Sequence, residues 1–128
     1  MPLTTTLPGG SSHFISLQTA IDMTTHYRSN RETILAVAYQ EQDILPLSET
    51  FNRAAIDSLL AVNGCAGIRI YYAMDRNDDT VHAILVAVNE GNEDILPSNS
   101  LLNEAEPEIV EIGQRCPPSC PPASDLNS

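Results

Sequence analysis

The stretch that decides the fold is GIRIYYAM at residues 67–74, followed by DRNDD at residues 75–79 and VHAILVAV at residues 81–88. The first segment alternates with a period of two, which is the pattern of a β-strand because successive side chains point to opposite faces. The last segment is a β-branched apolar run, and the Asp- and Asn-rich residues between them are typical of a turn. The sequence therefore predicts an antiparallel hairpin whose strands are both covered on two faces.

Two helices are predicted before the hairpin. Ser16 is a suitable N-cap for an amphipathic helix that covers residues 17 to about 31. Asn52 is a suitable N-cap for the second helix, with Phe51 packing ahead of the cap and Gly64 ending the segment. We therefore expect the second helix to present one apolar stripe to the sheet.

Three other segments complete the expected elements. Residues 33–39 are nearly all apolar, and their length and β-branched content favour a buried strand, with a short helix as the alternative. Residues 91–107 are polar and contain prolines, which indicates a loop. Residues 108–112 are expected to form a third strand at an edge of the sheet.

The predicted fold class is α+β, with two main helices packed on a small antiparallel sheet that is centred on the hairpin. A chain of 128 residues is long enough for one domain but not for two. The apolar periodicity begins near residue 14 and fades before the proline-rich end. We therefore predict a flexible N-terminal segment over residues 1–13, a single α+β domain over residues 14–115 and a Pro/Cys-rich tail over residues 116–128.

The charge composition restricts the classes of function. The net charge is −11, and all six basic residues are arginines, so lysine is absent. Schiff-base chemistry and a Walker-type phosphate loop both require a lysine. Nucleic acids and anionic membrane surfaces attract basic patches, so neither is an expected partner.

The expected location is the cytoplasm. No apolar stretch has the length of a membrane span, and the N-terminus has no signal-peptide pattern. Three cysteines give an odd number, which fits a reducing compartment better than a framework of disulfides.

The tail CPPSC, at residues 116–120, leaves several interpretations open. Cys116 and Cys120 could ligate zinc together with Cys65 and a histidine, although otherwise no cofactor is expected. They could instead form a disulfide, which needs Cα atoms about 4.4–6.8 Å apart and hence a turn. A polyproline II run would hold them about 12 Å apart, and Pro117 and Pro118 would then form a stiff arm that docks on a partner. The plainest alternative is a tail that packs on its own domain.

The GIRIYYAM segment, the ILVAV segment at residues 84–88 and the CPPSC tail are similar to those of a family of small bacterial proteins with a GIRIYY-type strand and a C-terminal CPPxC. The resemblance covers most of residues 14–120. The family has no known function, so the resemblance implies only a self-contained domain in which the tail belongs to the pattern. It assigns no role to any residue.

The function that we expect from the sequence is that of a non-enzymatic interaction or structural module that forms a homo-oligomer. Its predicted contact residues are Tyr71, Tyr72 and the two prolines of the tail, and a protein partner is an additional expectation. The alternative is a small metal-binding or thiol-redox protein that uses the C-terminal cysteines. An enzyme that uses His82 or Arg69 stays open, but the sequence contains no catalytic motif.

Overall fold

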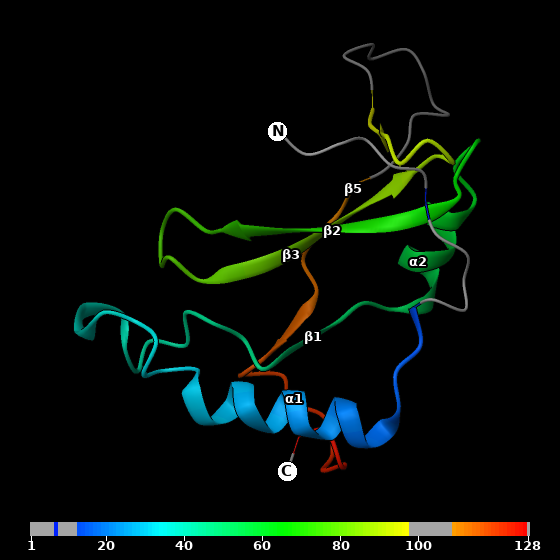
Figure 1. Cartoon of the computed structure of the whole chain (residues 1–128). Helices are drawn as coiled ribbons and strands as arrows, with labels where there is room; N and C mark the ends of the chain where they lie inside the picture. The colour runs from blue at the N-terminus through cyan, green and yellow to red at the C-terminus, as the bar shows by residue number, and fades with distance from the viewer. Residues whose placement is uncertain (1–6, 8–12, 98–108, 128) are drawn as a thin grey trace. The chain divides into compact units, whose positions relative to one another are not determined.

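The fold is α+β, with two α-helices, antiparallel sheets and a central hairpin (Figure 1). The computed structural model describes residue 7, residues 13–97 and residues 109–127. Most of the predicted N-terminal segment therefore lies outside the described residues. The elements follow in the order α1 (Leu17–Asn30), the 3₁₀ helix η2 (Val37–Tyr39), β1 (Ser48–Thr50), α2 (Arg53–Leu60), β2 (Gly67–Met74), β3 (Val81–Val88), β4 (Asp94–Ile95), β5 (Ile109–Val110) and β6 (Gln114–Cys116).

The chain forms two compact units, each assembled from segments that are distant in the sequence. The first unit contains residues 1–8, 51–73 and 83–113, and the second contains residues 9–50, 74–82 and 114–128. Strands β2 and β3 contribute residues to both units. The predicted single domain over residues 14–115 stays a prediction.

The first unit is built on a sheet with the order β2-β3-β4, in which β5 also pairs with β3. All the pairs whose register is known are antiparallel: Ala87 lies opposite Ile95, and Leu85 lies opposite Val110. Helix α2 packs on this sheet because its buried Leu59 joins Leu85 and Val110 in one apolar core. The side chains packed against this core belong to Phe51, Ala55, Ile56, Ile68 and Ala83.

The predicted hairpin is confirmed, and both strands have the expected bounds. Strand β5 confirms the third strand near residues 108–112. The prediction of a loop over residues 91–107 was wrong at β4, where Asp94 and Ile95 pair with β3. Two residues are too few to produce a recognisable alternation, so the sequence pattern does not reveal this strand.

The two strands of the hairpin differ in burial, and the prediction that both are covered on two faces was wrong for β2. The last four residues of β3, from Leu85 to Val88, are buried. In β2, by contrast, the side chain of Ile70 is 51% exposed and that of Tyr72 is 82% exposed. The apolar composition of β2 therefore predicted the strand, but it did not predict whether other parts of the protein bury its side chains.

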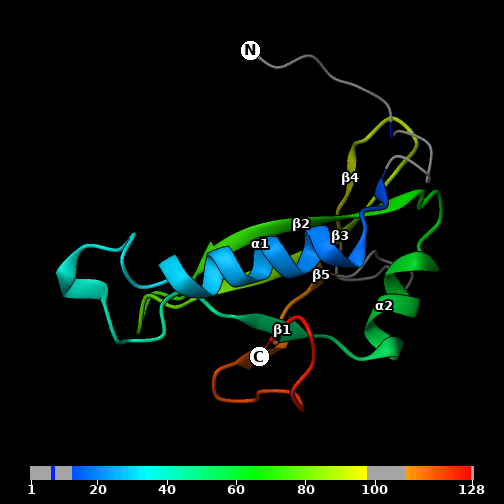
Figure 2. The ribbon, with the colours of Figure 1, turned by 60° about the horizontal axis from the view of Figure 1, so that its bottom comes forward.

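The second unit contains α1 and a small sheet formed by β1 and β6. Helix α1 begins as predicted, because the backbone N–H of Thr19 donates a hydrogen bond of 3.1 Å to Oγ of Ser16. Ser48 pairs with Cys116 in an antiparallel register. The backbone N–H of Leu47 extends this pairing with a 2.7 Å bond to the carbonyl of Cys116. The C-terminal segment thus returns to lie beside β1 (Figure 2).

Residues 33–39 do not form the expected strand. They form a turn followed by η2, and Val37 is almost fully exposed. Local hydrogen bonds close this segment: Nε2 of Gln40 donates to the carbonyl of Leu35 at 3.0 Å, and the N–H of Glu41 donates to Oε1 of Glu32 at 2.7 Å. The first of these bonds satisfies the main-chain carbonyl of Leu35, which a strand would direct to a neighbouring strand.

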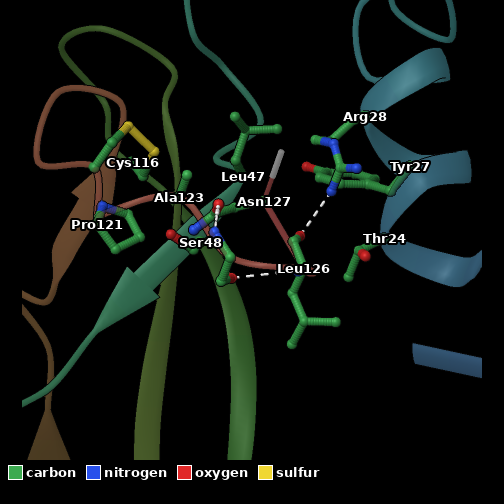
Figure 3. A pocket seen from close by; sticks show the side chains of 12 residues that line it. Thr24, Tyr27, Arg28, Leu47, Ser48, Cys116, Pro121, Ala123, Leu126 and Asn127 are labelled. Atoms are coloured by element: carbon green, nitrogen blue, oxygen red, sulfur yellow. Dashed lines mark hydrogen bonds between the residues drawn. A yellow bond between two sulfur atoms is a disulfide. The ribbon is translucent and has the colours of Figure 1, made fainter. Parts of the chain in front are cut away.

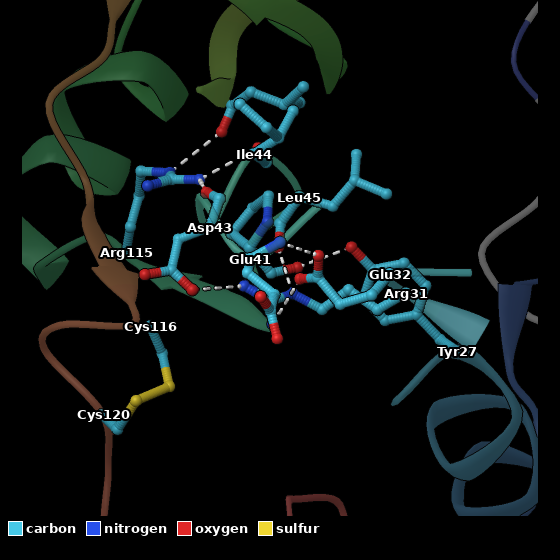
Figure 4. A network of polar contacts seen from close by, with 12 residues as sticks. Tyr27, Arg31, Glu32, Glu41, Asp43, Ile44, Leu45, Arg115, Cys116 and Cys120 are labelled. Carbon is cyan, nitrogen blue, oxygen red and sulfur yellow. Dashed lines mark hydrogen bonds and ion pairs between the residues drawn. A yellow bond between two sulfur atoms is a disulfide. The ribbon is translucent and has the colours of Figure 1, made fainter. Parts of the chain in front are cut away.

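Two arginines fix the loop that precedes β1 (Figure 4). Arg115 donates from Nε to the carbonyl of Val81 at 2.9 Å and from Nη2 to the carbonyl of Asp43 at 2.9 Å. Arg31 forms an ion pair of 3.1 Å with the carboxylate of Asp43 and also donates to the carbonyl of Leu45. The five N–H groups of a guanidinium allow one side chain to bind several acceptors at once, so these arginines tie β6 and α1 to the loop.

Candidate functional site

Strand β2 carries the first candidate site, an unpaired strand edge. Among the strands of the described residues, β2 pairs with β3 alone. Its outer edge therefore presents main-chain donors and acceptors to which another strand can bind. On one face of this strand lie the exposed side chains of Ile70 and Tyr72.

The opposite face of β2 contains a polar cluster. Nη1 of Arg69 forms an ion pair with Oδ1 of Asp94, and Nη2 donates to the carbonyl of Asn92 at 2.8 Å. The hydroxyl of Tyr71 donates to the other oxygen of Asp94. Hydrogen bonding to Tyr71, followed by Asp94, raises the pKa of Arg69 above its ordinary value. Of the two predicted contact tyrosines, Tyr71 is therefore bound within its own unit, whereas Tyr72 projects outward.

The second candidate site is the C-terminal cysteine pair, which forms a disulfide (Figure 3). The two Cα atoms lie 4.5 Å apart, and the N–H of Ser119 donates to the carbonyl of Arg115 at 2.8 Å. The run therefore turns, as the disulfide alternative requires, and does not form the extended arm that was another alternative for Pro117 and Pro118. A closed loop of this length cannot contain a polyproline II segment with the predicted span. That these two prolines contact a partner stays a prediction. Cys116 is 4% exposed, whereas Cys120 is exposed.

The predicted metal ligands do not all share one unit. Cys65 belongs to the first unit, where it has a free, partly exposed thiol whose Sγ donates to the carbonyl of Gly67 at 3.3 Å. Cys116 and Cys120 belong to the second unit. A thiolate ligand requires a reduced cysteine, so zinc binding by these three residues stays a prediction for the reduced protein.

A cavity of about 660 Å³ lies in the second unit beside the disulfide (Figure 3). Its walls come from one face of α1, from the start of β1 and from the C-terminal segment. The lining residues are Thr24, Tyr27, Arg28, Leu47, Ser48, Cys116, Cys120, Pro121, Ala123, Ser124, Leu126 and Asn127. The sequence does not predict this cavity. The spacing of Thr24, Tyr27 and Arg28 indicates a common helix face, but no sequence signal shows that the tail folds back against it.

The polar side chains of the α1 wall already bind protein atoms. The hydroxyl of Thr24 donates to the carbonyl of Ala20 at 2.9 Å, and that of Tyr27 donates to the carbonyl of Pro46 at 2.7 Å. Burial of the phenol raises the pKa of Tyr27 above its ordinary value of 10.0. Arg28 donates from Nη1 to the carbonyl of Leu126 at 2.6 Å. The two hydroxyls and Nη1 of Arg28 in this wall are therefore already hydrogen-bonded to protein carbonyls.

His82, the candidate base of an enzyme, lies at the tip of the hairpin. Its Nε2 is 2.9 Å from Oγ1 of Thr80, and this buried hydroxyl donates to Oδ1 of Asp78 at 2.7 Å. Hydrogen bonds from Thr80 lower the pKa of Asp78 below its ordinary value of 3.8. The three side chains are spaced at intervals of two residues, so they fasten the tip of the hairpin. Nothing in their geometry points to a substrate.

Comparisons with known proteins give no family assignment. No protein-family model matches the chain, and no curated protein or solved structure matches it. The resemblance that the GIRIYYAM and CPPSC segments suggested stays a prediction. Within the described part of the chain, no helix has the length and apolar character needed to cross a membrane.

Proposed function

We propose that this protein is a non-enzymatic interaction module that assembles with a second copy of itself through the outer edge of β2. The observation that carries this proposal is the exposure of Ile70 and Tyr72 on a strand whose outer edge pairs with no other strand in the part of the chain that the structure describes. A long edge strand with apolar side chains readily accepts another strand. Its eight residues have the length of an ordinary strand in a sheet.

The charges on β2 also support strand pairing. Proteins commonly protect an exposed edge by placing charged side chains on it. Arg69 is the only charged residue between Gly67 and Met74, and it is bound to Asp94 and Asn92. The edge therefore lacks a free charge that would oppose a neighbouring strand.

An antiparallel pair of identical strands satisfies the two-fold symmetry of a dimer. Centring this pair on Tyr71 places Ile70 of each copy opposite Tyr72 of the other. Aromatic and β-branched side chains form favourable pairs across strands, worth about 0.2–1 kcal/mol each. We therefore favour this register, which repeats the pair twice.

Substitution of Tyr72 tests this proposal. Tyr72→Lys places a charge in the centre of the paired strands, so we expect the dimer to dissociate at least tenfold more readily. Light scattering after size-exclusion chromatography measures the mass. Tyr39→Lys is the matched control, because Tyr39 is an exposed tyrosine of η2. Equal effects of the two substitutions, or none from Tyr72→Lys, would rule out assembly through β2.

Thiol–disulfide exchange is a second candidate function, favoured by the different exposure of the two bridged cysteines. A thiolate of a partner thiol can attack the exposed Sγ of Cys120, forming a mixed disulfide while Cys116 leaves as a thiolate. A second partner thiolate then attacks the partner's sulfur and releases the thiolate of Cys120. The two partner thiols are oxidised to a disulfide, and the protein gains two electrons as a dithiol.

Equilibration with mixtures of reduced and oxidised glutathione tests this alternative. Alkylation followed by mass spectrometry measures the fraction of the disulfide that is reduced. Redox function predicts a transition within the range of cellular thiol buffers and a trapped mixed disulfide in Cys116→Ser. Cys65→Ser provides the control with an intact bridge. A bridge that stays oxidised in excess reduced glutathione would contradict the exchange function.

Two finer expectations depend on the thiol state. Zinc binding by Cys65, Cys116 and Cys120 predicts that reduced protein retains metal in native mass spectrometry and that Cys116→Ser loses it. A cytoplasmic location predicts that rapid alkylation of intact cells finds Cys116 and Cys120 reduced for part of the time, since stable disulfides are typical of oxidising compartments. A permanently bridged pair in cells would argue against the cytoplasm.

A further inference from the structure

We propose that the cavity beside the disulfide binds a neutral, mainly apolar small molecule of the size of a medium-chain alcohol, and that the Cys116–Cys120 bridge holds one wall of this site in place. The volume of about 660 Å³ is within the range of small-molecule sites, roughly 300–1,000 Å³. All of its lining residues belong to the second unit. The site therefore shares no lining residue with β2.

The chemistry of the lining selects the ligand. Leu47, Pro121, Ala123, Leu126 and the disulfide contribute apolar surface (Figure 3). The polar side chains of α1 donate to protein carbonyls, as described above. A cation would lose its hydration and meet the like charge of Arg28, and an anion would have to compete with the carbonyl of Leu126 for that guanidinium, so a neutral molecule fits this lining better.

The C-terminal wall also satisfies its own polar groups. Nδ2 of Asn127 donates to the carbonyl of Pro122 at 3.1 Å, and Oδ1 of Asn127 accepts a 2.7 Å bond from the N–H of Ser124. These bonds close residues 122–127 into a compact loop that presents Leu126. The disulfide at Cys120 and the bond from Arg28 to the carbonyl of Leu126 hold this loop to the rest of the unit, one near each of its ends.

This arrangement makes binding dependent on the redox state. Reduction removes the cross-link between Cys120 and Cys116, so the wall that begins at Pro121 is then attached to β6 only through the main chain of residues 117–120. A ligand must then also order this segment when it binds, and the cost of ordering lowers its affinity. The oxidised protein is therefore the form that binds more tightly.

Titration of the full-length protein with 1-hexanol, 1-octanol and 1-decanol tests the site. Burial of one methylene contributes about 0.8 kcal/mol, so affinity should increase about fourfold with each methylene. Calorimetry gives the affinity, and amide shifts of Ala123 and Leu126 in NMR spectra give the position. Octanoate and octylammonium should each bind more weakly than octanol. Absent binding, an affinity independent of chain length, or tighter binding of either ion would overturn the proposal.

Two pairs of variants connect binding to this cavity. Ala123→Trp fills the space from an exposed position and should weaken decanol binding at least tenfold, whereas Ala54→Trp on the exposed face of α2 should leave it unchanged. Cys120→Ser opens the bridge but keeps the buried Cys116, and should weaken binding about fivefold, as reduction of the wild type should. Cys65→Ser should have no effect. Unchanged binding in Ala123→Trp would overturn the location, and unchanged binding in Cys120→Ser would overturn the role of the bridge.

Discussion

Strands β2 and β3 are neighbours of equal length and similar apolar content, yet the structure buries them to different degrees. Strand β3 has β2 along one edge and both β4 and β5 along the other, and its Leu85 lies in the core with Leu59 of α2. Strand β2 has one strand partner among the described residues and leaves Ile70 and Tyr72 exposed. The difference shows that burial depends on what packs around a strand, and that exposed apolar residues in a regular strand indicate a surface for association.

The largest effect is expected on the free energy of unfolding, when one side chain of β3 and one of β2 are each truncated to alanine. Leu85→Ala removes packing at a buried position, so we expect the free energy of unfolding to fall by about 2–5 kcal/mol. Ile70→Ala removes a side chain that is 51% exposed, so its cost should be less than about 1 kcal/mol. Urea denaturation at low protein concentration measures both values.

The outcome of this pair is informative in either direction. Similar losses for both variants would show that Ile70 is covered within the monomer, which would remove the association surface. A much larger loss for Leu85→Ala would sharpen the contrast between the two strands.

The next effect concerns the sheet of two short strands, β1 and β6. The last residue of β6, Cys116, forms the disulfide with Cys120. The disulfide closes a loop of five residues, for which the entropic model predicts a stabilisation of about 2 kcal/mol. We expect Cys120→Ser to lose approximately this free energy of unfolding. Reducing agent should then have no further effect on the variant, while Cys65→Ser should respond to it as the wild type does. A loss of folded signal that is caused by aggregation, and that does not depend on the urea concentration, would not count as this effect.

Salt gives a smaller effect and tests whether β2 joins two copies of the same chain. Each copy carries a net charge of −11, so the copies repel each other at low ionic strength. Screening should strengthen the dimer several-fold between about 20 and 300 mM salt. Fluorescence anisotropy of a labelled chain measures the dissociation constant. A dimer that weakens with salt would indicate a contact between opposite charges instead of apolar strand pairing.

The smallest effect concerns the turn that joins β2 to β3. The hydrogen bonds from Thr80 lower the folded pKa of Asp78 below 3.8, so its ionised form stabilises the folded state. This stabilisation is present above the unfolded pKa and is lost as the pH falls through the folded pKa. Asp78→Asn should therefore differ from the wild type in urea denaturation at pH 6 and approach it near pH 2. An equal difference at both values would contradict the assigned cause.

The sequence predicted the elements better than it predicted the sites. Alternation and caps located β2, β3 and the starts of both helices, since these signals are local. Strand β4 and the β1–β6 sheet are too short to show alternation. The cavity forms because the tail returns to α1. This return requires a turn inside the CPPSC run, and the sequence of that run is equally compatible with an extended form. The tail alone therefore did not decide between a disulfide, a metal site and a docking arm.

The most direct test of the central claim is sedimentation velocity of the wild-type protein from about 1 to 200 µM under oxidising, chelator-free conditions. Assembly through β2 predicts that the mass rises with concentration from the 13.9 kDa of one chain toward twice that value. It also predicts that Tyr72→Lys stays at the mass of one chain. A wild-type protein that sediments as a single chain at every concentration would contradict the account.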